Sequence, residues 1–187
     1  MSAAKKKSLV TPIGKTQWFS LTKTDKFGNY TCSLILEDSP ETHKLISEIN
    51  SIAGEDFTKK PFELQADGSY LIKLKGKSQG TKKDNTTYVI NPPVLYNSLG
   101  KKLEGADLLS LNVGNGSEMR AKIEVSSYVM VNQETQEVMK GISCKIKSAQ
   151  IAKIVEFQSE DSESGFDALE MGIDSESDSK PNDGYDF

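Results

Sequence analysis

The chain has 187 residues, of which 36% are hydrophobic, enough for one domain with a modest core. No apolar run approaches the roughly 18 residues that a membrane-spanning helix needs, and two cysteines and one histidine exclude a disulfide scaffold and a Cys/His zinc site. The net charge of −4 is unevenly distributed: residues 158–187 hold ten acids and one base (−9), whereas residues 1–157 hold 17 acids and 22 bases (+5).

The composition changes at Phe157, after which Ser, Asp, Glu and Gly dominate. Such a segment buries too little apolar surface to offset the entropy lost on ordering, so we predict disorder for residues 158–187. Phe166, Leu169 and Ile173 recur there at helical spacing, which leaves open a short helix that forms on binding. We therefore expect one folded domain over residues 1–157 and an acidic tail over residues 158–187.

The first predicted elements are two strands joined by a turn over residues 23–29. Side chains alternate along both strands, which predicts one buried face for each. The expected buried residues are Gln17, Phe19 and Leu21 in the first strand and Tyr30, Cys32, Leu34 and Leu36 in the second. The opposite, outward face of the first strand carries Thr16, Trp18 and Ser20.

A helix is predicted directly after the second strand. Ser39 is the expected N-cap and Pro40 occupies the first helical position, which proline favours. The apolar residues recur at helical spacing, and Gly54 can end the helix. The predicted apolar stripe consists of Leu45, Ile49, Ile52 and Ala53. A helix with one such stripe suits a position that caps the end of a small barrel.

The remaining elements are strands. They are predicted at residues 70–77, 86–90 and 94–96, followed by two long strands at 119–131 and 142–157. Five or six strands with one capping helix indicate an all-β fold. The favoured architecture is a five-stranded OB-fold β-barrel, with the helix between the second and third strands. A β-sandwich is the competing architecture.

No catalytic, cofactor or metal site is predicted, so we do not expect an enzyme. Gly14-Lys15-Thr16 lacks the first glycine of a phosphate-binding loop, because position 9 is Leu9. His43 is the only imidazole and is expected on the surface. Cys32 and Cys144 fall at strand positions and are expected to be buried thiols.

The folded part instead has a basic and aromatic pattern, with 21 lysines and one arginine. For any single pair of lysines a merely solubilising role is a sufficient explanation, but several groups on neighbouring elements favour a binding surface. The candidate cations are Lys73, Lys75, Lys77, Lys82, Lys83, Lys101, Lys102, Arg120, Lys122, Lys145 and Lys147. The candidate stacking aromatics are Trp18, Tyr96 and Tyr128. Lysine binds phosphate as a point charge, so this pattern favours single strands bound without sequence preference.

Several segments together carry a resemblance to a known family. They are TPIGKTQWFSLTKTDKFGNYTCSLIL, SPETHKLISEIN, PPVLYNSLGKKLEG, GNGSEMRAKIEVSSYVM and the terminal Gly184-Tyr185-Asp186-Phe187. In these the sequence resembles the single-stranded DNA-binding proteins of short-tailed bacteriophages. The resemblance implies an OB-fold body whose helix follows the second strand, and an acidic tail that ends in an aromatic residue.

The resemblance also implies a function. The protein would coat single-stranded DNA in phage replication, recombination and repair, in the cytoplasm of the infected host, and would promote annealing. The tail, through Asp183, Tyr185, Asp186 and Phe187, would dock the phage DNA polymerase and helicase–primase. A homodimer is compatible with this, and neither a cofactor nor a membrane is implied.

Two other classes stay open. An acidic-tailed chaperone module would bind basic proteins, and a structural virion β-barrel would assemble without nucleic acid. The charge division suggests how the favoured class would be regulated: the tail would act as a tethered mimic of DNA that DNA displaces.

Overall fold

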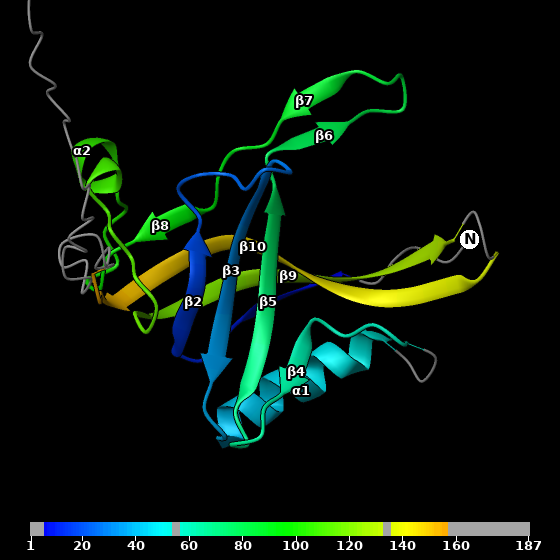
Figure 1. Ribbon diagram of the computed structural model, residues 1–187, viewed down its shortest axis with the longest axis horizontal. Coiled ribbons are helices and arrows are strands. Elements are labelled where there is room, and N and C mark those ends of the chain that lie inside the picture. Colours follow the sequence, from blue (N-terminus) through cyan, green and yellow to red (C-terminus); the bar gives the residue numbers. More distant parts are fainter. Residues whose placement is uncertain (1–5, 54–56, 133–135, 157–187) are drawn as a thin grey trace, which may run out of the picture. The chain divides into compact units, whose positions relative to one another are not determined.

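The computed structural model of the chain describes residues 6–53, 57–132 and 136–156 (Figure 1). These residues form ten strands and two helices. The elements are β1 (Lys6–Val10), β2 (Gly14–Ser20), β3 (Asn29–Leu36), α1 (Pro40–Ala53), β4 (Phe62–Leu64), β5 (Tyr70–Lys77), β6 (Gln79–Thr81), β7 (Thr87–Val89), β8 (Val94–Tyr96), α2 (Gly105–Leu109), β9 (Glu118–Val131) and β10 (Val138–Lys153). Within the described residues no helix is long and apolar enough to cross a membrane.

Five strands close into a ring of hydrogen-bonded neighbours. β2 pairs with β3 and β3 with β5, both antiparallel. β5 then pairs in parallel with β10, β10 pairs antiparallel with β9, and β9 returns to β2. β1 extends the sheet beside β9, β8 beside β10, and β4 beside β5. β6 and β7 form a separate two-stranded sheet, and this hairpin projects from the end of β5 (Figure 1).

The inward side chains of this ring form the core. Leu34 and Leu36 of β3, Ile72 of β5 and Ile123 and Val125 of β9 have no exposed surface. Burial of an aliphatic side chain of this size stabilises a fold by about 1.5–3 kcal/mol, so the ring is held mainly by these contacts. The expected inward residues Cys32, Leu34 and Leu36 are buried, and Tyr30 packs partly against the core.

Helix α1 begins where the sequence predicts. The backbone N–H of Thr42 donates to Ser39 Oγ at 3.2 Å, which confirms Ser39 as the N-cap. Leu45, Ile49 and Ile52 of the predicted stripe are buried, and Ile46 is buried with them. The helix contacts β1, β9 and β10 and so covers one end of the sheet. Gly54 and the side chain of Ala53 lie outside the described part of the chain.

The prediction for the first strand is wrong at Thr16. Strict alternation would place it outward with Trp18, yet Thr16 is fully buried and its hydroxyl donates to the Gly114 carbonyl at 3.2 Å. The pairing of β2 with β3 is irregular between Gln17 and Ser20, and Trp18 there has a positive φ of 53°. This bulge reverses the alternation, so that Thr16 points inward and Trp18 outward. Leu21 is buried as expected.

Other elements differ from the sequence-based expectation in number. The sequence predicts five or six strands and one helix, whereas the described residues also include β1, β4, β6 and the five-residue helix α2. The added strands are short: β1 and β4 lie on the edges of the five-strand ring, and β6 pairs with β7 in the separate sheet. β10 begins at Val138, within the expected loop, because it pairs with β9 up to Val131. Phe157 and the acidic tail are outside the described residues.

Candidate nucleic-acid interface

A groove of about 580 Å³ lies on the outward side of β5 and β10. The β6–β7 hairpin and the end of β9 complete it. Its lining residues are Pro61, Lys73, Lys75, Lys77, Gln79, Gly80, Thr81, Tyr88, Ile90, Tyr128, Ile142, Ser143, Cys144 and Lys145. Five of the residues predicted for DNA binding are therefore brought together: Lys73, Lys75, Lys77, Tyr128 and Lys145. We call this the main groove.

The lysines of the main groove are placed by strand alternation. Ile72, Leu74 and Gly76 of β5 point inward, so Lys73, Lys75 and Lys77 point outward. Cys144 and Ile146 are buried in the same way, which turns Lys145 of β10 outward. The parallel pairing of β5 with β10 sets Lys145 opposite Lys75. Two strands far apart in sequence thus contribute cations to one site.

The positive charge of the main groove is only partly compensated. Lys73 Nζ lies 2.6 Å from Glu63 Oε1, so this lysine is paired within the protein. Lys75, Lys77 and Lys145 form no ion pair with any described residue. The pKa of Asp25 is lowered, chiefly by the hydrogen bond from the Asn29 backbone and in smaller part by the charge of Lys75. Three lysines therefore remain available to an external anion.

A second, smaller hollow of about 400 Å³ collects three more predicted residues: Tyr96, Arg120 and Lys122. Arg120 Nε donates to Gln150 Oε1 at 2.9 Å, and Gln150 Nε2 donates to the carbonyls of Asn97 and Ser98 at 3.2 and 3.0 Å. Gln150 thus ties the guanidinium to the turn after β8. Arg120 and Lys122 lie on the same outward side of β9 as Tyr128, because the residues between them alternate inward.

The other predicted cations do not line either hollow. Lys82 and Lys83 are exposed at the tip of the β6–β7 hairpin. Lys101 is exposed in the turn after β8, and Lys102 is ion-paired with Glu104, a contact that raises the pKa of Lys102 and lowers that of Glu104. Lys147 Nζ lies 3.4 Å from Glu124 Oε2. These lysines are therefore peripheral to the main groove.

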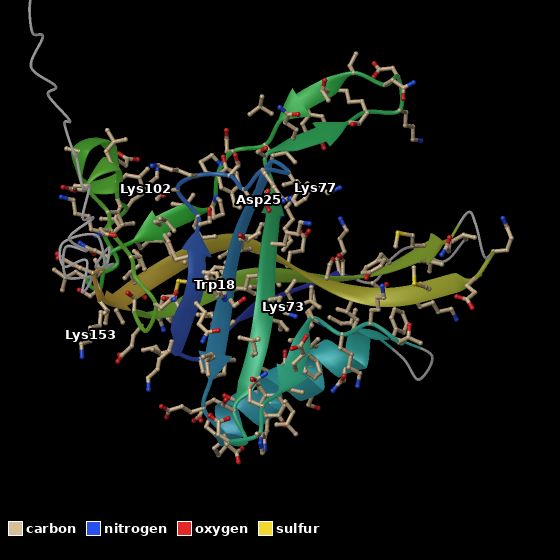
Figure 2. All side chains as sticks on the ribbon, in the orientation of Figure 1. Trp18, Asp25, Lys73, Lys77, Lys102 and Lys153 are labelled. Carbon is tan, nitrogen blue, oxygen red and sulfur yellow. The ribbon has the colours of Figure 1, made fainter. Side chains whose placement is uncertain are left out.

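Trp18 lies on β2 and is 74% exposed. Its backbone N–H donates to Asn115 Oδ1 at 3.0 Å, which holds the bulge in place. Figure 2 shows Trp18 on β2, with β3 between it and Lys73 on β5. The outward position of the indole is as predicted, but Trp18 does not line the main groove.

Two aromatic residues of this region were missed by sequence reasoning. Tyr88 lines the main groove from β7 and is 46% exposed. Phe27, in the turn between β2 and β3, is 76% exposed, and Lys26 Nζ lies 5.1 Å from its ring centroid. Ser78, at the start of the β6–β7 hairpin, anchors this turn by donating to the Gly28 carbonyl. The available signal for Phe27 was its place in an otherwise polar turn, where no core can receive it.

The two cysteines and the histidine lie where the sequence predicts them. No three His, Cys, Asp or Glu side chains of this part of the chain are grouped to hold a metal ion. Cys32 and Cys144 are free and buried as expected, and burial raises the pKa of each thiol to about 12. His43 is on the surface as expected, with Nε2 2.6 Å from Asp38 Oδ1. Asp183, Tyr185, Asp186 and Phe187, predicted to contact partners, lie outside the described residues.

Comparison of the sequence with protein-family models and with curated proteins gives no match. Solved structures do match. Gp2.5, a single-stranded DNA-binding protein encoded by bacteriophage T7, aligns with a TM-score of 0.66 at 20% identity, over 98% of this chain and 100% of that one. The single-stranded DNA-binding protein of bacteriophage Enc34 aligns with a TM-score of 0.56 at 12% identity, over 84% of this chain and 88% of that one.

The Enc34 protein in complex with single-stranded DNA aligns equally well, with a TM-score of 0.56 at 12% identity, over 81% of this chain and 89% of that one. The alignments extend over most of both chains in each case. The chain therefore has the fold of these bacteriophage single-stranded DNA-binding proteins.

Proposed function

We propose that the protein binds single-stranded DNA without sequence preference, in the main groove. The observation that carries the proposal is the meeting of two tyrosines, Tyr88 and Tyr128, with three lysines that form no ion pair with any described residue: Lys75, Lys77 and Lys145. Lysines attract phosphates as point charges, and aromatic rings stack on any base. Arginine, which reads guanine by paired hydrogen bonds, is absent from the main groove.

The closed ring supports an OB-fold. The order β2, β3, β5, β10, β9 with a parallel β5–β10 pair supports a five-stranded barrel, and the position of α1 in the chain between β3 and β5 supports the helix placement expected for it. OB-folds bind oligonucleotides on the face of their second and third strands and at the loop between the first two. Here these positions carry Lys73, Lys75 and Lys77 and the turn that exposes Phe27.

The likeness to phage proteins supports a role beyond binding. We infer that the protein coats and protects single strands in phage DNA replication, recombination and repair in the host cytoplasm, and that it promotes annealing. Coating requires contacts that tolerate every sequence, which lysine and stacked aromatics provide. The acidic tail with Asp183, Tyr185, Asp186 and Phe187 would dock the polymerase and helicase–primase, and a homodimer is compatible with this role.

The salt dependence of affinity tests the proposal. For single strands, log affinity falls with log salt by about 0.7 for each phosphate neutralised. We expect the double variant Lys75→Ala/Lys145→Ala to bind oligo(dT) more weakly than the native protein, with unlabelled competitor as the control for specificity. The slope of log affinity against log salt should be smaller by about 0.7 for each lysine removed. Lys44→Ala/Lys153→Ala removes the same charge from exposed lysines outside the main groove and is the control.

Gel shifts with single- and double-stranded competitors complete the test. Single strands should compete effectively and duplex weakly. Equal slopes for the two double variants would remove the main groove from the interface. Failure of the native protein to bind either nucleic acid would contradict the function itself, and retention of a basic protein instead would favour the chaperone class.

A further inference from the structure

Two tyrosines of the main groove each lie over a glycine on the neighbouring strand. Tyr88 of β7 is directly opposite Gly80 of β6, and Tyr128 of β9 is directly opposite Gly141 of β10. A Cβ atom added at either glycine would overlap Cζ, Oη and Cε1 of the facing ring. The far end of each ring therefore occupies the space that any larger residue on the partner strand would need.

The backbone does not require glycine at these two positions. Gly28, Gly68, Gly100, Gly105 and Gly116 have positive φ, whereas Gly80 and Gly141 do not. Glycine in the interior of a strand weakens it, because it loses more entropy on folding and packs no side chain. Glycine at these two positions thus destabilises the strands, and the backbone conformation does not explain why glycine is there.

Other glycines of the barrel show the contrast. At Gly14 an added Cβ would meet the Leu36 side chain at 2.5 Å and the Ile35 carbonyl oxygen at 2.6 Å, so that glycine allows close packing of the core. At Gly76, which points inward from β5, an added Cβ would meet ordinary contacts of 3.6–3.8 Å. Only at Gly80 and Gly141, among the described glycines, is the obstructing group a tyrosine ring that lines the main groove.

Gly141 is buried although it lies on the outward side of β10, with Ser143 and Lys145. The ring of Tyr128 provides this cover. The ring of each tyrosine thus packs against the main chain at the facing glycine and also lines the main groove. The two rings come from elements that do not pair with each other, since β7 belongs to the separate two-stranded sheet.

We propose that Tyr88 and Tyr128 are two stacking platforms for nucleobases and that Gly80 and Gly141 are positioning residues that seat them. This rests on the proposed function. The lysines of the main groove hold phosphates, and each ring presents its open side to a base. A ring already seated on the backbone has less rotational freedom to lose on binding, so the glycines increase affinity without touching DNA.

The experiment compares two ligands of equal length and charge, oligo(dT) and an oligomer whose sugars carry no bases. Removal of a stacking ring weakens binding of single strands by about 5- to 150-fold per base. We expect Tyr88→Ala and Tyr128→Ala to lose affinity for oligo(dT) in this range and to keep their affinity for the abasic oligomer. Gly80→Ala and Gly141→Ala should lose oligo(dT) affinity selectively in the same way.

A double-mutant cycle separates positioning from a structural role. Gly141→Ala should have no further effect in a Tyr128→Ala background, because the ring that it displaces is gone. The same holds for Gly80→Ala with Tyr88→Ala, a pair in the projecting hairpin and outside the hydrophobic core. Gly76→Ala is the matched control and should leave both affinities unchanged. Thermal unfolding confirms that each variant is folded.

The inference and the proposed function fail differently. Equal loss of affinity for the two oligomers, or additive effects of Gly141→Ala and Tyr128→Ala, would show that the glycines act through the fold and would overturn the inference. Native-like affinity of both tyrosine variants would also overturn it. In each of those cases native binding of single strands would persist, whereas its absence would contradict the proposed function.

Discussion

At the scale of single residues, Trp18 shows how one backbone torsion exposes a large apolar side chain. A positive φ is rare for a bulky residue, and here it is held by the hydrogen bond to Asn115 and by the bulge in β2. Strained positions of this kind concentrate at functional sites. The tryptophan is the only one in the chain, so its fluorescence reports this position alone.

We predict that the emission of Trp18 is that of a solvated indole in the free protein and is quenched on saturation with oligo(dT). Trp18→Ala should weaken binding by roughly 1–3 kcal/mol if one base stacks there. Its stability should change by less than about 0.5 kcal/mol, because the side chain is 74% exposed. Fluorescence titration and urea unfolding measure these two effects. Unchanged emission at saturation would exclude Trp18 from the interface.

At the scale of elements, helix α1 depends on its first turn. Ser39 Oγ accepts the Thr42 N–H at 3.2 Å and also lies 3.0 Å from Thr42 Oγ1. The helix then buries Leu45, Ile49 and Ile52 against the sheet. The N-terminal end of α1, at Pro40, is therefore coupled to the buried core. This core lies beneath the strands that form the main groove.

We predict that Ser39→Ala lowers the free energy of unfolding by about 0.5–2 kcal/mol, because the Thr42 N–H loses its acceptor. Denaturant unfolding at constant m-value measures the loss. Ser39→Asp restores a capping oxygen and is the control, and it should unfold near the native midpoint. A loss in Ser39→Asp as large as that in Ser39→Ala would show that the hydroxyl acts through another contact.

The predictable elements were those whose own sequence carries a period. The alternation of β3 and β5 and the N-cap and apolar stripe of α1 are local, so the buried faces of these elements followed from the sequence. β1 and β4 have no such pattern. They are strands because they pair with β9 and β5, and this pairing is not visible in their own sequence. The bulge at Trp18 was not predictable either, because it depends on Asn115, which is 97 residues away.

The main groove was predictable in part for the same reason. Alternation alone places Lys73, Lys75 and Lys77 on one face. Lys145 joins these lysines only because β5 pairs in parallel with β10. Tyr88 reaches the main groove only because of the direction in which the β6–β7 hairpin projects. Both are long-range properties that no local pattern encodes. The glycines that back the tyrosines became visible only from the cross-strand register.

At the scale of the whole molecule, the main feature is the division of charge into +5 for residues 1–157 and −9 for residues 158–187. If residues 158–187 are disordered, as the sequence predicts, this 30-residue segment has a root-mean-square span of about 30 Å. Tethering gives an effective concentration on the order of millimolar, so that even weak attraction to the lysines would compete with DNA.

We predict that deletion of residues 158–187 tightens binding of oligo(dT) at low salt and has little effect at high salt, because ions screen exposed charges. A full-length variant with the ten tail acids replaced by Asn and Gln should behave like the deletion. Affinity measured at two salt concentrations tests both. Equal low-salt affinities for the native chain and the deletion would contradict competition by the tail.

The parallel pair of β5 and β10 has a consequence for the order in which the molecule is made. Its two partners, Lys75 and Lys145, are 70 positions apart in the chain, and β9, which closes the ring, lies between them. A chain leaving the ribosome displays the lysines of β5 long before β10 and the ring of Tyr128 can face them. The complete main groove therefore exists only after nearly all of the domain has been synthesised, so a nascent chain that lacks β10 has no complete groove with which to bind nucleic acid.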